Sequence, residues 1–203
     1  MNNNIDNKDF YCIGIIWNVA NDYYYQIIKY LASSIQIIGV SLYFFENDYC
    51  KFVKDLYKTD FSTDSIKKEY LISKIKRMEE SSNRTFLSFI GIISSPQYSY
   101  NFNKKKEYCQ QVRNLKDEVR NKFSSEIENY VYDVLLHMSD NEKEMLEMFK
   151  TFKNYDNMIV EKLINEDEYS KFLSFTNVHL CSEKEALEKT GVNNEKGRTR
   201  KGN

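Results

Sequence analysis

Residues 132–142 read YDVLLHMSDNE and give the clearest indication of how this chain folds. A short apolar run of strand length ends at His137, and a helix-opening pattern begins two residues later at Ser139. Ser139 and Glu142 have the spacing of a capping box, in which a serine and a glutamate bond to each other's backbone N–H groups at a helix start. The stretch therefore predicts a strand followed by a helix, with His137 between them. Because the start of a helix favours anions, His137 is well placed to meet a phosphate group.

The rest of the chain alternates between apolar runs that indicate strands and amphipathic runs that indicate helices. Strands are expected over residues 11–17, 35–45, 85–93 and 130–136, with a bulge or bend at Gly39 in the second strand. Helices are expected over residues 23–34, 47–57, 65–80, 104–127 and 141–153, and a loop over 94–103. This order favours an α+β fold, a ferredoxin-like four-stranded antiparallel sheet with helices on one face.

Length and composition favour one folded domain with an extension. The 203 residues are 41% apolar, which is enough for one core. We expect the α+β domain over residues 1–153, a helical extension over 154–181 and a flexible polar and basic tail over 182–203. No apolar run approaches the length of a membrane span, and the N-terminal residues lack a signal-peptide pattern. A cytoplasmic location is the simplest interpretation.

Charge, cysteine and glycine usage exclude several classes of function. The formal net charge of −1 gives no overall field that would attract nucleic acid or a membrane surface. The four cysteines are far apart in the sequence, and the pair His179 and Cys181 lacks the further ligands that a zinc site needs. The six glycines are scattered, so the chain has no glycine-rich phosphate loop.

The element order and the motif at His137 together resemble the nucleoside diphosphate kinase family. That family has this order of strands and helices, with a helix pair between its second and third strands. Its active-site sequence, Asn-x-x-His-Gly-Ser-Asp-Ser, lies at the end of the fourth strand, where this chain has residues 134–141, VLLHMSDN. Upstream, residues 119–123, VRNKF, look like the family's Ile-Arg-Gly-Asp-Phe. The resemblance in architecture covers residues 11–153.

The resemblance implies a phosphotransferase in which the imidazole of His137 accepts a phosphoryl group. Arg120 would stabilise that group, and Ser139 would steady the imidazole or a nearby carboxylate. The implied ligand-binding side chains are Tyr57, Phe61, Arg113 and Lys104, with Tyr57 or Phe61 facing a base. The partner would be a nucleotide or another phosphorylated small molecule, and Mg²⁺ would arrive with the nucleotide. Open sheet edges, and the oligomers of the related family, also suggest a homo-oligomer.

Two departures from the family's pattern keep other interpretations open. Trp17 stands where the family has a lysine that contacts the phosphate, and Met138 replaces the glycine after the histidine. The chain could therefore bind a ligand without turnover. It could also keep the fold as a non-catalytic interaction or regulatory module, such as one encoded by a mobile element or a virus. In the plainest interpretation this corner is structural, and helix capping alone accounts for Ser139 and Glu142.

Overall fold

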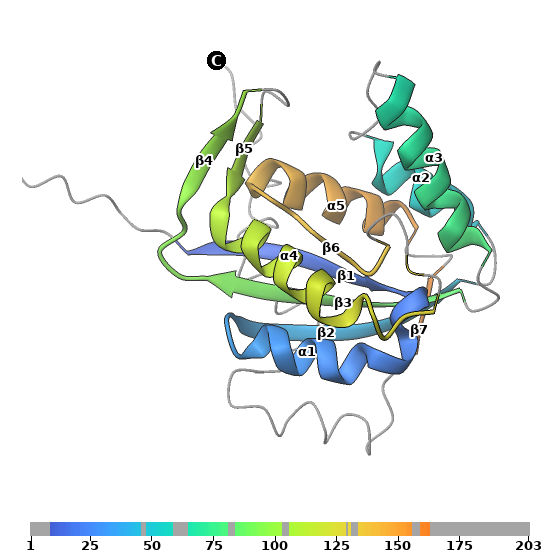
Figure 1. Cartoon of the computed structure of the whole chain (residues 1–203), viewed down its shortest axis with the longest axis horizontal. Helices are drawn as coiled ribbons and strands as arrows, with labels where there is room; N and C mark the ends of the chain where they lie inside the picture. Colours follow the sequence, from blue (N-terminus) through green and yellow to red (C-terminus); the bar gives the residue numbers. More distant parts are fainter. Residues whose placement is uncertain are drawn as a thin grey trace, which may run out of the picture.

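The apolar runs found in the sequence pair into an antiparallel sheet at the centre of the molecule (Figure 1). The computed structural model describes residues 9–45, 48–58, 65–80, 84–102, 106–128, 130, 134–155 and 159–162. The strands of this part of the chain are β1 (Phe10–Trp17), β2 (Gln36–Phe45), β3 (Thr85–Ile93), β4 (Tyr98–Asn101), β5 (Lys106–Cys109), β6 (Leu136–Met138) and β7 (Ile159–Lys162). Its helices are the 3-10 helix η1 (Asn18–Tyr23) and the α-helices α1 (Tyr24–Ala32), α2 (Tyr49–Leu56), α3 (Ser65–Glu79), α4 (Gln110–Phe123) and α5 (Glu142–Asn154).

The strand order of the main sheet identifies the fold. The order is β6-β1-β3-β2-β7, and every neighbouring pair is antiparallel. Counted within this sheet along the chain, the first four strands of that order are the fourth, first, third and second, as in a ferredoxin-like fold. The prediction of an α+β ferredoxin-like fold is therefore confirmed. The irregularity expected at Gly39 is also present, because the register of β2 against β3 shifts between Ile37 and Gly39.

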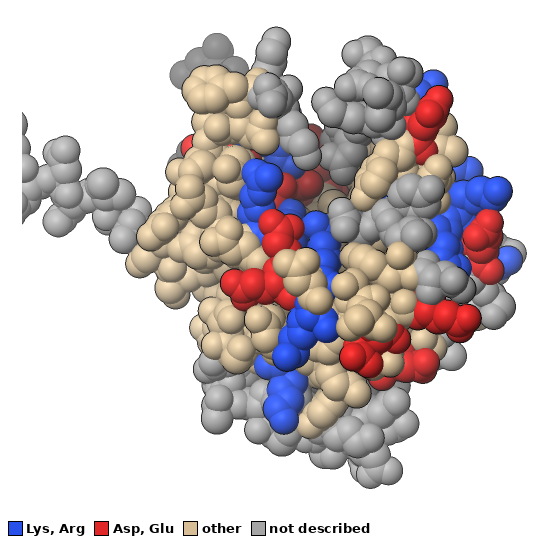
Figure 2. Space-filling view, in the orientation of Figure 1, with Lys and Arg blue, Asp and Glu red and all other residues tan. Residues whose placement is uncertain are grey.

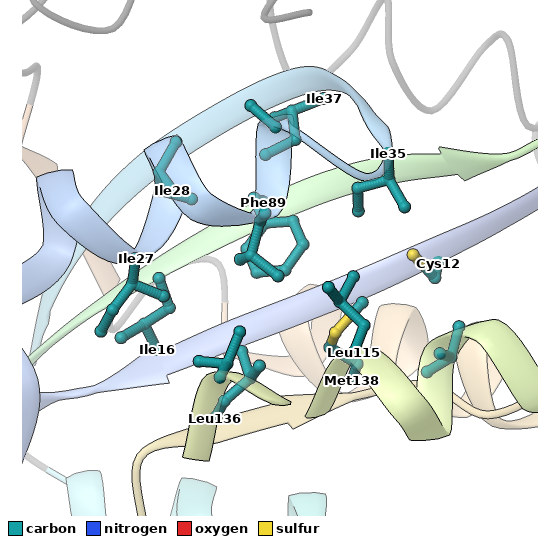
Figure 3. Packing of buried hydrophobic residues seen from close by; sticks show 14 of the residues in the cluster. Cys12, Ile16, Ile27, Ile28, Ile35, Ile37, Phe89, Leu115, Leu136 and Met138 are labelled. Carbon is teal, nitrogen blue, oxygen red and sulfur yellow. The ribbon is translucent and has the colours of Figure 1, made fainter. Parts of the chain in front are cut away.

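Helices cover both faces of the sheet, so the expectation that they lie on one face is wrong. Helices α1 and α4 pack on one face, where Ile16, Phe89 and Leu136 belong to one core cluster (Figure 3). Helices α2, α3 and α5 pack on the other face, over Trp17 and Phe86. The reason is that β1 and β3 are apolar at nearly every position, so both faces of the sheet must be buried.

A β-hairpin takes the place of the loop and helix start that were expected before residue 110. Tyr98–Asn101 pairs with Lys106–Cys109 in a separate two-stranded sheet that projects from the body of the molecule (Figure 1). Helix α4 therefore begins at Gln110 rather than at residue 104. The alternation of aromatic and polar side chains in Tyr98–Asn101 is the signal that indicates a strand here.

Strand β7 lies within the segment that was expected to be a helical extension. It pairs with Leu42–Phe45 of β2 and so covers part of a sheet edge that was expected to be open. The rest of that extension, and the tail over residues 182–203, lie outside the described residues. Among the helices that are described, none has both the length and the apolar character needed to cross a bilayer.

Candidate functional site

Strand β6 holds His137 against β1 and directs its side chain toward α2. His137 lies opposite Ile15 of β1, in a three-residue pairing. Its neighbours Leu136 and Met138 belong to the core cluster under α1 and α4. Because side chains alternate along a strand, His137 faces the other side of the sheet, where its ring lies 5.0 Å from the ring of Tyr57 in an edge-on arrangement. The local fold therefore separates the imidazole from the α4 side.

Ser139 attaches the end of β6 to β1. Its Oγ accepts a hydrogen bond from the backbone N–H of Ile13 at 3.0 Å, and its own N–H donates to the Ile13 carbonyl at 3.0 Å. Ser139 is fully buried. The hydroxyl proposed to steady the imidazole is thus bonded to the neighbouring strand, where it extends the pairing of β6.

The helix cap of α5 is two residues later than the sequence analysis placed it. Asn141 is the N-cap, and its side-chain oxygen accepts from the Glu144 N–H at 2.9 Å. The Glu144 carboxylate in turn accepts from the Asp140 N–H at 2.8 Å. The assignment of Ser139 and Glu142 to the cap is wrong because the Ser139 hydroxyl is already used by Ile13. The pattern Asn-x-x-Glu at 141–144 was an equally valid signal.

A cleft of about 190 Å³ opens beside His137, between the end of α2, strand β6 and helix α5. More of its lining surface is apolar than polar, and the ionisable residues that contribute to the lining are Asp55, Glu144, Glu147, Lys58, Lys150 and His137. Two of the carboxylates are held by neighbours. Asp55 accepts from the Tyr155 hydroxyl at 2.5 Å, and Glu144 accepts from Lys106 at 2.9 Å. Burial raises the pKa of Glu144.

His137 is held in its neutral form. Only 8% of the residue is exposed, and burial, with the nearby ammonium of Lys74 next in importance, lowers the pKa of the imidazole well below its usual range. Lys74 is itself buried at 7% exposure, with its Nζ 4.8 Å from the centre of the Tyr57 ring. A neutral imidazole keeps one nitrogen lone pair, and the ring of His137 belongs to the lining of the cleft.

Arg120 and Lys116 lie on α4 and bond to the outer edge of β6. Arg120 Nη2 donates to the Leu136 carbonyl at 3.0 Å, and Lys116 Nζ donates to the Met138 carbonyl at 3.3 Å. Lys116 also pairs with Asp140, and although burial opposes ionisation, Lys116 and Lys106 hold the pKa of that carboxyl below its usual range. Basic side chains gather along α4 (Figure 2), yet these two serve the backbone of β6. Arg120 is therefore not in contact with the imidazole.

The remaining predicted ligand residues do not form a site together. Tyr57 is only 1% exposed and packs against Trp17 and His137, so it cannot present its ring to a base. The guanidinium of Arg113 lies 5.1 Å from the ring of Tyr108 on the hairpin, outside the cleft lining. Phe61 and Lys104 lie outside the described residues.

The sequence did not single out the cleft residues Asp55, Glu147 and Lys150, or Lys74, whose charge acts on His137. Each of these residues lies in a helix whose charged sequence is typical of a solvent-exposed surface. They come near His137 only because α2, α3 and α5 pack on the same face of the sheet. A resident metal ion is not supported by this set. Among the described residues, no group of three histidine, cysteine or carboxylate side chains is arranged to hold one.

No protein-family model matches this chain, and no curated protein matches it in sequence. A solved structure of the Aquifex aeolicus nucleoside diphosphate kinase is similar, with a TM-score of 0.45 and 9% sequence identity, over 71% of this chain and 95% of that chain. A likeness at this level does not establish membership of that family. The fold class rests on the strand order described above, and any function must be argued from the cleft at His137.

Proposed function

We propose that this chain binds a phosphorylated ligand, a nucleotide or another small molecule, in the cleft at His137, and that the imidazole accepts its phosphoryl group. The observation that carries the proposal is a buried, neutral imidazole that opens into a cleft bearing two lysines. A neutral imidazole is the nucleophilic form, since protonation would remove the lone pair that attacks phosphorus. Lys58 and Lys150 would stabilise the negative charge on the phosphoryl oxygens.

Mg²⁺ would enter the cleft only when it is bound to the ligand. When the donor is a nucleotide, the ion would arrive on its phosphates and neutralise part of their charge. The carboxylates of the cleft do not form a metal site of their own, so no step is assigned to the ion.

Phosphohistidine formation tests the proposal directly. The protein is incubated with ³²P-labelled phosphoryl donors, with Mg²⁺ present for the nucleotides, and acid-labile label is measured on the protein. We expect label on the wild type and none on His137→Gln. The matched control is His179→Gln, because the chain has only two histidines. Label that persists in His137→Gln, or no label with any donor, would sink the proposal.

The second candidate is a binding module without catalysis. The position of Arg120 on the α4 side favours it, because the cleft then lacks the arginine that the resemblance implies for the phosphoryl group. The carboxylates of Glu144 and Glu147 also face the place where phosphate charge would develop. Thermal shift with phosphorylated ligands, combined with the labelling experiment, separates the two candidates, because a binding module would be stabilised without acquiring acid-labile label. A ligand at 100 times its Kd stabilises the protein by about 2.7 kcal/mol, whether or not it transfers its phosphoryl group.

A further inference from the structure

We infer that the phosphoryl donor at His137 is a small molecule with a single phosphoryl group, such as an acyl phosphate, and not a nucleotide. This inference rests on the proposed function and narrows its substrate class. Three properties of the cleft support it: its size, the chemistry of its lining and the balance of its charges.

The cleft is small. Its volume of about 190 Å³ lies below the roughly 300–1,000 Å³ of pockets that enclose drug-sized ligands. A phosphoryl group and a few further heavy atoms fit such a space. A nucleoside triphosphate would have to leave its sugar and base outside, where they would contribute little binding energy.

The described lining offers no surface on which a base could stack. Bases are commonly held against aromatic rings, which supply a flat apolar face. The uncharged side chains that line this cleft are Leu56, Met148 and Thr151, and none is aromatic. The ring of Tyr57, which contacts His137, is 1% exposed and is covered by His137 and Lys74. Of the two rings that the resemblance implies for base recognition, Tyr57 is therefore a core residue and Phe61 lies outside the described residues.

The charges of the cleft match one phosphoryl group better than three. Lys58 and Lys150 can balance the two negative charges of a phosphate monoester or an acyl phosphate. A triphosphate would bring its additional charges toward Asp55, Glu144 and Glu147, and like charges at close range repel. Asp55 and Glu144 are fixed in place by Tyr155 and Lys106, so they cannot readily turn away.

The transfer step balances without a further reactant. The lone pair of the unprotonated imidazole nitrogen attacks phosphorus and forms an N–P bond. The P–O bond to the acyl group breaks at the same time, and the carboxylate leaves with the bonding electrons. The phosphoimidazolium then releases its N–H proton to water, which leaves a phosphohistidine with an uncharged ring and a negatively charged phosphoryl group, together with the free carboxylate.

The experiment compares donors on the intact protein. Initial rates of His137 phosphorylation are measured with acetyl phosphate, and with ATP and GTP in the presence of Mg²⁺, all at the same concentration. We expect acetyl phosphate to label at least tenfold faster, with saturation, and the label to be absent from His137→Gln. Lys150→Met should slow labelling severalfold, whereas Lys153→Met, an exposed position on the same helix outside the cleft lining, should not.

The outcomes separate the two proposals. Label on His137 that forms as fast or faster with ATP or GTP overturns the inference about the donor and leaves the phospho-acceptor proposal standing. Equal rates for the Lys150 and Lys153 variants also overturn it, because the charge argument then fails. No label from any donor overturns the proposed function, and the inference falls with it.

Discussion

Replacing Lys74 with methionine is expected to raise the pKa of His137, because a nearby ammonium group disfavours the protonated imidazole. The Lys74 ammonium lies 4.8 Å from the centre of the Tyr57 ring, which in turn lies 5.0 Å from the imidazole centre, so charge and imidazole are at most about 10 Å apart. At that separation two unit charges repel by roughly 1.7 kcal/mol in a protein of effective dielectric constant about 20. Burial and the cations Lys116, Arg120 and Lys106 remain in the variant, so the pKa should stay below the usual range of histidine.

Proton NMR of the histidine Cε1–H groups measures this change. The chain has two histidines, so the spectrum of His137→Gln assigns both signals. Lys74→Arg keeps the charge and should keep the low pKa, which separates charge from packing. Lys76→Met removes a lysine with a side chain 74% exposed on the same helix and should leave the pKa unchanged. The reasoning is refuted if Lys74→Met leaves the titration of His137 where it was, or if the arginine and methionine variants titrate alike.

Three further perturbations test the site and its support. The pKa of His137 is lowered in the folded state, so the unfolded state binds a proton at this residue first as the pH falls. The free energy of unfolding should therefore decrease below about pH 6.5, by up to about 1.4 kcal/mol per pH unit. Urea unfolding between pH 7 and pH 5 checks this, and His137→Gln should be less sensitive to pH over that interval. Arg120→Ala should lower the free energy of unfolding by about 1.5–3 kcal/mol, because the buried Leu136 carbonyl loses a charged donor. The same substitution should leave ligand affinity, measured by calorimetry, unchanged. A large loss of affinity with no change in the free energy of unfolding would indicate that Arg120 contacts the ligand. Gly14→Ala should destabilise the fold by roughly 1–3 kcal/mol or more, since the new Cβ would lie 2.1 Å from the buried ring of Phe89, and an unchanged urea midpoint would contradict that packing.

The fold was predictable because its strands carry their signal locally. Thr85–Ile93 is mostly apolar and is bounded by polar turns, and it forms β3 with the predicted limits. The apolar character of these strands also indicates which faces of the sheet are covered. A strand with apolar residues on both of its faces has no solvent face, so the sequences of β1 and β3 already required helices on both sides of the sheet.

The candidate site was predictable only at His137, and the reason is geometric. Arg120 was linked to it by distance along the chain and by a motif, neither of which shows on which face of a sheet a side chain will lie. Since successive residues of β6 face opposite sides, a cation that approaches from α4 meets the Leu136 carbonyl and not the imidazole. Lys74 and Lys150 come from helices packed on the other face, and no local pattern links them to the histidine.

The short length of β6 explains why the residues around His137 are tied to the backbone. A strand of three residues has few ladder bonds to fix its position, and it gains others from side chains. Ser139 bonds it to β1, while Lys116 and Arg120 bond to its outer carbonyls from α4. The imidazole is therefore oriented by the strand that carries it and by the packing of Tyr57. A carboxylate bonded to the imidazole would raise its pKa. Because strand pairing and ring packing orient His137 instead, the imidazole is held in place without being made easier to protonate.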